Sequence, residues 1–341
     1  MHLDFTPDSR IMAPLIKRKG NSMANEIKRV TRDQHQYFVA PDIDPVIELD
    51  PGDEVVVETV DCFSGAITSN DQVFNSVADV FEIVTGLNAV SGPIAVKGAE
   101  VGDVLKVEIL DIKVGMVGGK AVTAVFKDFG GLCNPYTVVD EIGPDTKVCD
   151  VRDNVIEFPL RGKGMVELPV KPMIGTIWTA PAAERRMSYV YDVHNCGNVD
   201  CHELGAGRTI LLPVRVQGGM LSLGDVHACM GHGEITGVAM ETAGDVHLRV
   251  SVIKAKSSAY HICPQIECER TIGSVGCHFG RALDDNVRSA YRDMVHRLVE
   301  FHGFDRTDAY ELLGQIGEVV VHQTLDDWNA VLVKMDRRFL V

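Results

Sequence analysis

The densest group of reactive side chains in this sequence lies between residues 192 and 234. It begins in DVHNCGNVDCHEL (192–204) and resumes in GDVHACMGHGE (224–234). Histidines and acids alternate there with glycine-bearing turns, which is more than a solvated surface requires, so we predict a catalytic or metal-binding site. The candidate side chains are Asp192, His194, Asn198, Asp200, His202, Glu203, Asp225, His227, His232 and Glu234.

Asp225 and His227 have the spacing that points most directly to a metal ion. Side chains two residues apart in a strand project from the same face, so this carboxylate and this imidazole are expected to lie side by side. Asn198 and Asp200 have the same spacing. Carboxylate oxygen and imidazole nitrogen are suitable ligands for zinc and other divalent cations. An isolated Asp-x-His pair is more often a surface pair, so the density of the whole stretch carries the prediction.

Such a site holds the groups that amide hydrolysis requires. A divalent cation can polarise a carbonyl group and lower the pKa of bound water towards about 7. A nearby glutamate can take a proton from water and later deliver it to the leaving amine. The glycines around Glu234 allow the backbone to approach a ligand closely.

Cysteines offer an alternative chemistry in the same stretch. Cys196, Cys201 and Cys229 lie near histidines, and a thiolate can attack an amide. Free cysteines are, however, usually small buried core residues. A second group could in principle form a structural zinc site: Cys263, Cys268, His261 and His278. Its cysteine spacing is unusual for such a site, so buried core thiols are favoured there as well.

The elements around these residues are predicted to be mainly strands. The segments 47–61, 96–112 and 217–231 share one device, a glycine-bearing turn that ends in Gly-Asp and is followed by a strand-like run. Such units at short intervals indicate a β-sandwich or barrel-like architecture. Alternation predicts half-buried strands at Val104, Val107, Ile109 and Ile112, and at Val246, Leu248, Val250 and Val252.

Helices are expected only near the C-terminus. A helical stripe from Asp284 ends before Gly303, a predicted C-cap, and Asp305 or Thr307 can cap a shorter helix through Leu313. Strand character returns in EVVVHQTLDD (318–327) and NAVLVKM (329–335). We therefore predict a mainly β fold with one long helix near the C-terminus. The stripe comprises Val287, Tyr291, Met294, Val295, Leu298 and Val299.

The expected organisation is one catalytic unit built from two β regions. Residues 1–25 are read as a flexible leader, 26–150 as an N-terminal β region and 151–341 as a C-terminal β region with the helices. A boundary is expected near 145–165, where the segment at 143–154 is polar, with little support for separable domains.

Composition limits the partners of this chain. The formal net charge is -15, from 48 acidic and 33 basic residues, which disfavours nucleic acid and favours a neutral substrate. The nine cysteines are odd in number and follow no secretory signal, so free thiols in the cytoplasm are expected. No apolar run approaches the roughly 20 residues of a membrane span.

At these residues the sequence resembles the acetamidase/formamidase family, whose members hydrolyse short-chain amides to an acid and ammonia. The resemblance runs from about residue 27 to 335, with the order of segments kept. The matching segments are ETVDCFSG (58–65), GPIAVKGAEVGDVLKVEILDI (92–112), PMIGTIWTAP (172–181), GNVDCHELGAGRTILLPV (197–214), GGMLSLGDVHACMGHGEITGVAMET (218–242) and the tail AYELLGQIGEVVVHQTLDD (309–327).

The resemblance implies jelly-roll-like and barrel-like portions and a divalent metal, zinc being expected and calcium an alternative. It implies that the metal-proximal set is Asp61, His194, Asp225 and His227. Asn198 and Asp200 match a Gly-Asn-x-Asp motif at or beside the pocket, with Asn198 assigned to substrate binding and Asp200 to catalysis. Glu234 matches the acid that closes a Gly-x-Gly-Glu turn and is assigned the proton transfer.

Two positions depart from the family pattern. His232 stands where an aspartate is common, so the preferred metal or amide is expected to differ. Trp178 stands where a smaller residue is common, and its indole could line the pocket or simply pack. Both are counted as candidate substrate-binding residues.

The leading hypothesis is a metal-dependent hydrolase of a small neutral amide of the formamide or acetamide type. A cyclic-amide (lactam) hydrolase and a non-catalytic amide- or metal-binding protein on the same fold are the alternatives. Exposed edge strands are expected to be covered by a second copy, which predicts a homodimer or a higher homo-oligomer.

Overall fold

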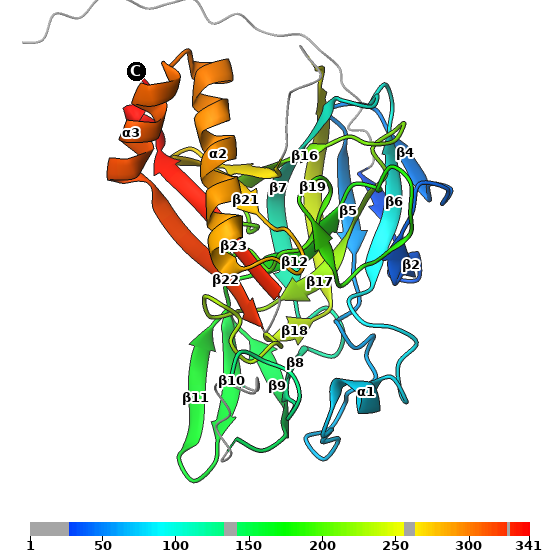
Figure 1. Ribbon diagram of the computed structural model, residues 1–341. Helices are drawn as coiled ribbons and strands as arrows, with labels where there is room; N and C mark the ends of the chain where they lie inside the picture. Colours follow the sequence, from blue (N-terminus) through cyan, green and yellow to red (C-terminus); the bar gives the residue numbers. More distant parts are fainter. Residues whose placement is uncertain (1–26, 133–141, 256–262, 326–327) are drawn as a thin grey trace, which may run out of the picture.

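The computed structural model describes residues 27–132, 142–255, 263–325 and 328–341 (Figure 1). The predicted leader at 1–25, Cys133 and His261 lie outside these residues. Two large sheets dominate the described part of the chain, and the prediction of a mainly β fold with a long C-terminal helix is confirmed.

The first sheet has nine strands and takes them from both ends of the sequence. The central pairs are antiparallel, and β19 follows β7 along its whole length. In sheet order the strands are β1 (Lys28–Val30), β5 (Glu54–Glu58), β19 (Gly244–Ile253), β7 (Val104–Val114), β16 (Arg208–Pro213), β20 (Gln265–Glu267), β21 (Thr271–Gly276), β23 (Trp328–Asp336) and β22 (Glu318–Leu325).

The second sheet has twelve strands. Nine of them follow one another in the order β11 (Gly164–Pro169), β10 (Val155–Leu160), β9 (Asp145–Arg152), β8 (Lys120–Val125), β18 (Glu241–Thr242), β17 (Leu221–His227), β12 (Met173–Trp178), β15 (Cys196–Asn198) and β14 (Tyr191–Asp192). Of the remaining three, β6 (Val90–Val96) pairs with β17, and β2 (His35–Gln36) and β4 (Ile47–Leu49) pair with β6. A separate pair joins β3 (Phe38–Val39) to β13 (Arg186–Met187).

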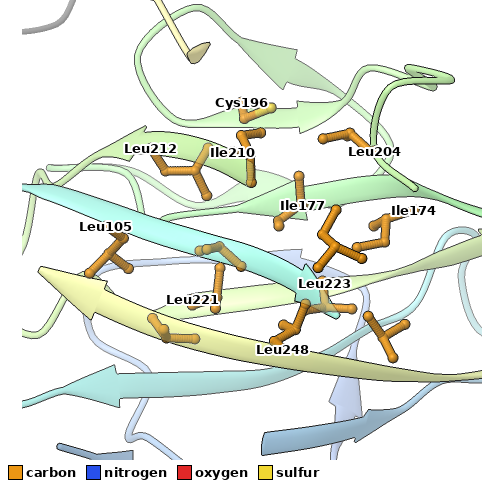
Figure 2. Packing of buried hydrophobic residues seen from close by; sticks show 14 of the residues in the cluster. Leu105, Ile174, Ile177, Cys196, Leu204, Ile210, Leu212, Leu221, Leu223 and Leu248 are labelled. Atoms are coloured by element: carbon orange, nitrogen blue, oxygen red, sulfur yellow. The ribbon is translucent and has the colours of Figure 1, made fainter. Parts of the chain in front are cut away.

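Strands from before and after residue 150 are interleaved in both large sheets. The polar segment at 143–154 contains the whole of β9 and the turn into β10. The main apolar core lies between the two sheets. Figure 2 shows Leu248 of the first sheet packed near Leu223 of the second, and Leu105 and Ile177 belong to the same fully buried cluster.

The strand predictions are confirmed where alternation was clearest. Val104, Val107 and Ile109 are buried on β7, and Val246, Leu248 and Val250 are buried on β19. Alternation places Val107 and Ile109, and the three valine and leucine side chains of β19, in the core between the sheets, whereas Val104 is three residues from Val107 and lies outside that core.

The helix predictions are confirmed as well. Helix α2 (Leu283–His302) ends at Gly303, whose φ of 71° is the left-handed conformation of a C-cap. Helix α3 (Arg306–Ile316) begins after Asp305, whose side chain accepts the first backbone N–H groups. Both helices cover one face of the hairpin of β22 and β23 (Figure 1).

Two short helical turns complete the structure: α1 (Val77–Val80), which has a capping box at Ser76, and the 3-10 turn η1 (Arg337–Phe339). Among the described helices, none is long and apolar enough to cross a membrane.

Candidate active site

Three carboxyl groups surround the imidazole of His227 inside the protein. Its Nε2 atom lies 3.6 Å from Asp200 Oδ1, 3.6 Å from Asp225 Oδ1 and 3.4 Å from Glu241 Oε2. All four residues are buried, and these three oxygens have no hydrogen-bond partner in the described part of the chain. Glu234 joins them, because one of its oxygens lies within 4.8 Å of ligand atoms of Asp200 and His227. These five residues are called the acid cluster below.

The second sheet brings the acid cluster together. Asp225 and His227 lie on β17, and the antiparallel register pairs His227 with Glu241 of β18. Asp200 follows β15, on the other side of β12 from β17. The predicted neighbourhood of Asp225 and His227 is therefore present, and strand pairing adds carboxyl groups from two further segments.

Three members of the acid cluster have a backbone conformation that side-chain-bearing residues rarely adopt. The φ angles are 43° at Asp200, 56° at Asp225 and 43° at Glu234. The left-handed region costs an L-residue about 1–2 kcal/mol. Such residues collect at functional sites, where the surrounding structure holds them in place. Asn88, which contacts the cluster, also lies there with a φ of 50°.

Two neutral side chains donate hydrogen bonds to Oδ2 of Asp225. Asn88 Nδ2 donates to Asp225 Oδ2 at 2.7 Å, and Thr176 Oγ1 donates to the same oxygen at 3.0 Å. Both donors also reach Asn198 Oδ1, at 3.2 and 2.6 Å. Because Oδ2 is occupied in this way, Oδ1 of Asp225 is the oxygen left to face His227.

The acid cluster contains more acid than its one imidazole can balance. Burial and the neighbouring Glu234 raise the pKa of Asp200 well above its ordinary value. Burial and the charge of Asp225 raise the pKa of Glu241 in the same way and raise that of Glu234 to about 8. Carboxyl groups this close cannot all ionise unless a cation lies among them.

Asp225 and His227 form the ionised pair of the cluster. Burial alone would raise the pKa of Asp225. The charge of His227 and the hydrogen bonds that Asp225 makes outweigh burial, so the pKa of Asp225 is lowered. Burial alone would lower the pKa of His227, and the contact with Asp225 raises it instead.

The C-terminal hairpin fixes the turn that carries Glu234. Thr324 of β22 donates its backbone N–H to Gly233 O at 2.9 Å and its hydroxyl to the same oxygen at 3.1 Å. The next residue back, Gln323, is buried and donates from Nε2 to Asp200 Oδ2. Residues near the end of the chain therefore position the two acids predicted to be catalytic.

Three members of the acid cluster, Asp225, Glu234 and Glu241, line a cavity of about 200 Å³, called the main cavity here. Its polar end is formed by Asn88, Asn198, Asp225, Glu234 and Glu241, with Cys62 beside them. Cys62 Sγ donates to Asn88 Oδ1 at 3.2 Å, and burial raises the pKa of this thiol well above its ordinary value.

The acid cluster fits a small divalent cation. Two ligands that each lie about 2.0–2.2 Å from a tetrahedral zinc ion are roughly 3.3–3.6 Å apart, and the three distances around His227 Nε2 are 3.4–3.6 Å. Asp200, Asp225 and Glu241 offer unpartnered buried oxygens for such an ion. A second, adjoining group of possible ligands is Cys62, Asp225 and Glu241.

Two residues of the metal-proximal set lie outside the acid cluster. The side chain of His194 is exposed, and its Nδ1 accepts from Arg215 at 3.2 Å, so the structure does not place it with the buried acids. Asp61 lies beside the site, where its Oδ1 accepts from Phe63 N at 2.8 Å and Gly65 N at 3.1 Å. Asp61 thus shapes the turn that presents Cys62 to the main cavity.

The expected pocket roles of Trp178 and His232 are not realised in the main cavity. Trp178 is fully buried in a small core, and its Nε1 donates to Ser188 O at 3.0 Å, so packing explains it. His232 stacks on His202 with ring centroids 4.0 Å apart and lines a different cavity, of about 340 Å³. Glu234 borders both cavities.

Sequence reasoning missed several residues of the site: Cys62, Asn88, Thr176, Glu241 and Gln323. The one sequence feature that could have indicated Glu241 is its position, since it is an acid that follows Glu234 by only a few residues. Of the predicted pocket residues, Asn198 does line the main cavity.

Comparisons with known proteins show which family the sequence is similar to. The sequence profile of the acetamidase/formamidase family matches residues 24–190 and 170–333. A formamidase of Methylophilus methylotrophus is 30% identical over 267 residues, and the match covers 65% of this chain and 65% of that protein.

Solved structures extend the likeness over nearly the whole chain. An acetamidase from Yersinia enterocolitica superposes with a TM-score of 0.82 and 33% identity, covering 92% of this chain and 93% of the other. An acetamidase from Bacillus halodurans gives a TM-score of 0.79 and 29% identity, covering 91% and 98%.

Proposed function

This chain belongs to the acetamidase/formamidase family, and from that premise we propose that it is a metal-dependent hydrolase of short-chain linear amides. The products would be a carboxylic acid and ammonia. The observation that carries the proposal is the buried acid cluster around His227 at the polar end of the main cavity.

Asp200, Asp225, His227 and Glu241 would hold the cation. When bound, a divalent ion supplies carbonyl polarisation and a more acidic water. We propose zinc, which accepts one imidazole and carboxylate oxygens; the oxygen-rich donor set also suits calcium.

Glu234 is the group that we assign to proton transfer. It borders the main cavity and lies beside Asp200 and His227, so its carboxylate can accept a proton at the polar end of the cavity. Glu234 would take the proton of the attacking water and return it to the leaving nitrogen. Asp200, which we also assign to the cation, has an oxygen within 4.8 Å of one of Glu234 and is held by Gln323, so it would keep the metal and the proton-transfer group side by side.

We assign Asn198 to orienting the amide. Its Oδ1 already accepts from Thr176 and Asn88, which leaves its NH₂ group as the donor for a substrate oxygen in the main cavity. A neutral substrate agrees with the formal charge of -15, which would repel an anion.

The setting that we propose is cytoplasmic and oligomeric. All cysteines in the described residues are free, as is usual in a reducing compartment. Edge strands such as β1 and β11 end the two large sheets, and a second copy could cover them.

Ammonia release from formamide and acetamide tests the function directly. The purified protein should be analysed for bound metal, treated with a chelator and then reloaded with zinc or calcium. We expect release by the loaded protein, loss after chelation and recovery after reloading. Failure of the metal-loaded protein to release ammonia from any short amide would overturn the proposal. Alkylation of the thiols with retained activity would exclude a cysteine nucleophile.

A further inference from the structure

The main cavity is much larger than the substrates named for the relatives require. Its volume is about 200 Å³, whereas about 10–15 Å³ on this measure accommodates one water molecule. Formamide carries only hydrogen on its carbonyl carbon, and acetamide a single methyl group. With the amide held at the acid cluster, either would leave most of the cavity to water.

Beyond its polar end, the main cavity is built from apolar and aromatic side chains. They include Phe63, Leu87, Phe126, Phe129, Tyr189 and Trp328. The charged residues among the described lining are three members of the acid cluster, and no lysine, arginine or histidine appears there. A charged group on the substrate's acyl side would therefore be desolvated without a partner.

The aromatic wall is preformed. The Trp328 ring stacks on Tyr189 with centroids 6.1 Å apart, and Phe129 meets it edge-on at 6.4 Å. Tyr191 and Phe279 contact the same indole at 6.1 and 5.1 Å. Since several rings hold Trp328, the apolar end offers a fixed surface and does not have to close around each substrate.

We propose that the preferred substrates are primary carboxamides with a branched or aromatic hydrocarbon acyl group. This inference rests on the proposed amide hydrolysis and, within it, moves the preferred acyl group from a short chain to a larger hydrocarbon group. The carbonyl and nitrogen lie at the acid cluster, and the hydrocarbon group fills the apolar end of the main cavity. Each added methylene that is buried there should raise kcat/KM about fourfold.

Steady-state kinetics on a substrate series test the proposal. The series is acetamide, isobutyramide and phenylacetamide, with glycinamide and malonamate as charged counterparts. We expect kcat/KM to rise in the first three, with phenylacetamide roughly 100-fold above acetamide, and to be lowest for the charged pair. Hydrolysis of acetamide that equals or exceeds that of the larger amides overturns the substrate class and leaves amide hydrolysis standing. No ammonia from any amide overturns the proposed function itself.

A variant that fills the cavity gives a second readout. Val77 lies on α1, is half-buried and lines the main cavity, so Val77→Phe should reduce the ratio of kcat/KM for phenylacetamide to that for acetamide by tenfold or more. Val101→Phe is the matched control, because Val101 is 67% exposed and outside the cavity. An unchanged ratio in a folded Val77→Phe protein contradicts the proposal. The substrate series on the unaltered protein decides the matter if this variant does not fold.

Discussion

Gly175 leaves room for the carboxylate of Asp225. The two residues face each other between the paired positions Ile174–Val226 and Thr176–Gly224 of β12 and β17. A Cβ atom on residue 175 would lie 2.6 Å from Asp225 Oδ2 and 2.6 Å from Asp200 Oδ1. The acid cluster can therefore assemble only beside a residue that has no side chain.

Gly175→Ala should displace both carboxylates and abolish tight metal binding. We expect kcat/KM for the best amide to fall by about 100-fold or more, because a ligand displaced by an ångström loses its geometry. Metal content after dialysis and steady-state kinetics measure the effect.

Gly314→Ala is the control for this substitution. Gly314 lies in α3, and an added Cβ meets nothing within 4 Å. It should leave activity intact and add up to about 1 kcal/mol to the free energy of unfolding. Full metal occupancy and activity in Gly175→Ala would show that β12 and β17 can shift to accommodate a side chain at residue 175. The close fit of Gly175 against Asp225 would then not be required.

Glu234→Gln should remove turnover while the metal stays bound. The change keeps the size of the side chain and its ability to hydrogen bond, but it removes the proton acceptor, which is worth about 10²–10⁴ in rate. Metal content and thermal stability should stay close to those of the unaltered protein. Glu311→Gln, on the surface of α3, serves as control. Retained turnover in Glu234→Gln would move proton transfer to another acid.

The histidines at 194 and 227 should respond in opposite ways. His227→Ala removes the imidazole at the centre of the acid cluster, so metal binding and activity should be lost. His194→Ala removes an exposed ring that accepts from Arg215, so both should stay within about twofold of the unaltered protein, as is usual for surface changes. Metal analysis of the two purified variants decides. Loss of metal from His194→Ala would return that residue to the ligand set.

Local pattern was enough to predict the elements of the fold. The alternation in β7 and β19 and the helical stripe of α2 repeat over many residues, and each reports directly on one buried face. The neighbourhood of Asp225 and His227 was predictable for the same reason, because two positions on one strand need no information about the rest of the chain.

The rest of the site depends on strand register, which the sequence does not display. Glu241 reaches His227 because β17 and β18 pair at those positions, and Asn88 arrives from a segment far upstream. Closeness in sequence was a poor guide for His194. This residue is only six positions from Asp200, but its side chain lies at the surface. Likewise, the indole that lines the main cavity belongs to Trp328, whereas Trp178 is core.

Removing the metal should make stability depend on pH. The pKa of Glu234 rises from 4.5 to about 8 through burial and the charge of Asp225, and those of Asp200 and Glu241 are raised as well. Between these values the folded protein keeps protons that the unfolded chain has lost, so the free energy of unfolding falls as pH rises. The pKa of Asp225 is lowered, so this group makes the free energy of unfolding rise with pH, but only in more acidic solution. The loss from Glu234 should be on the order of a few kcal/mol.

Thermal unfolding at pH 5.5, 7 and 8.5, with and without metal, measures this dependence. The chelated protein should melt at progressively lower temperature as pH rises. The loaded protein should change less, because a divalent cation favours the ionised carboxylates and stabilises the folded state that binds it. Chelated Glu234→Gln should show a weaker dependence than the chelated unaltered protein, since its amide does not titrate. A chelated protein that gains stability between pH 5.5 and 8.5 would mean that the acid cluster is already balanced without a cation.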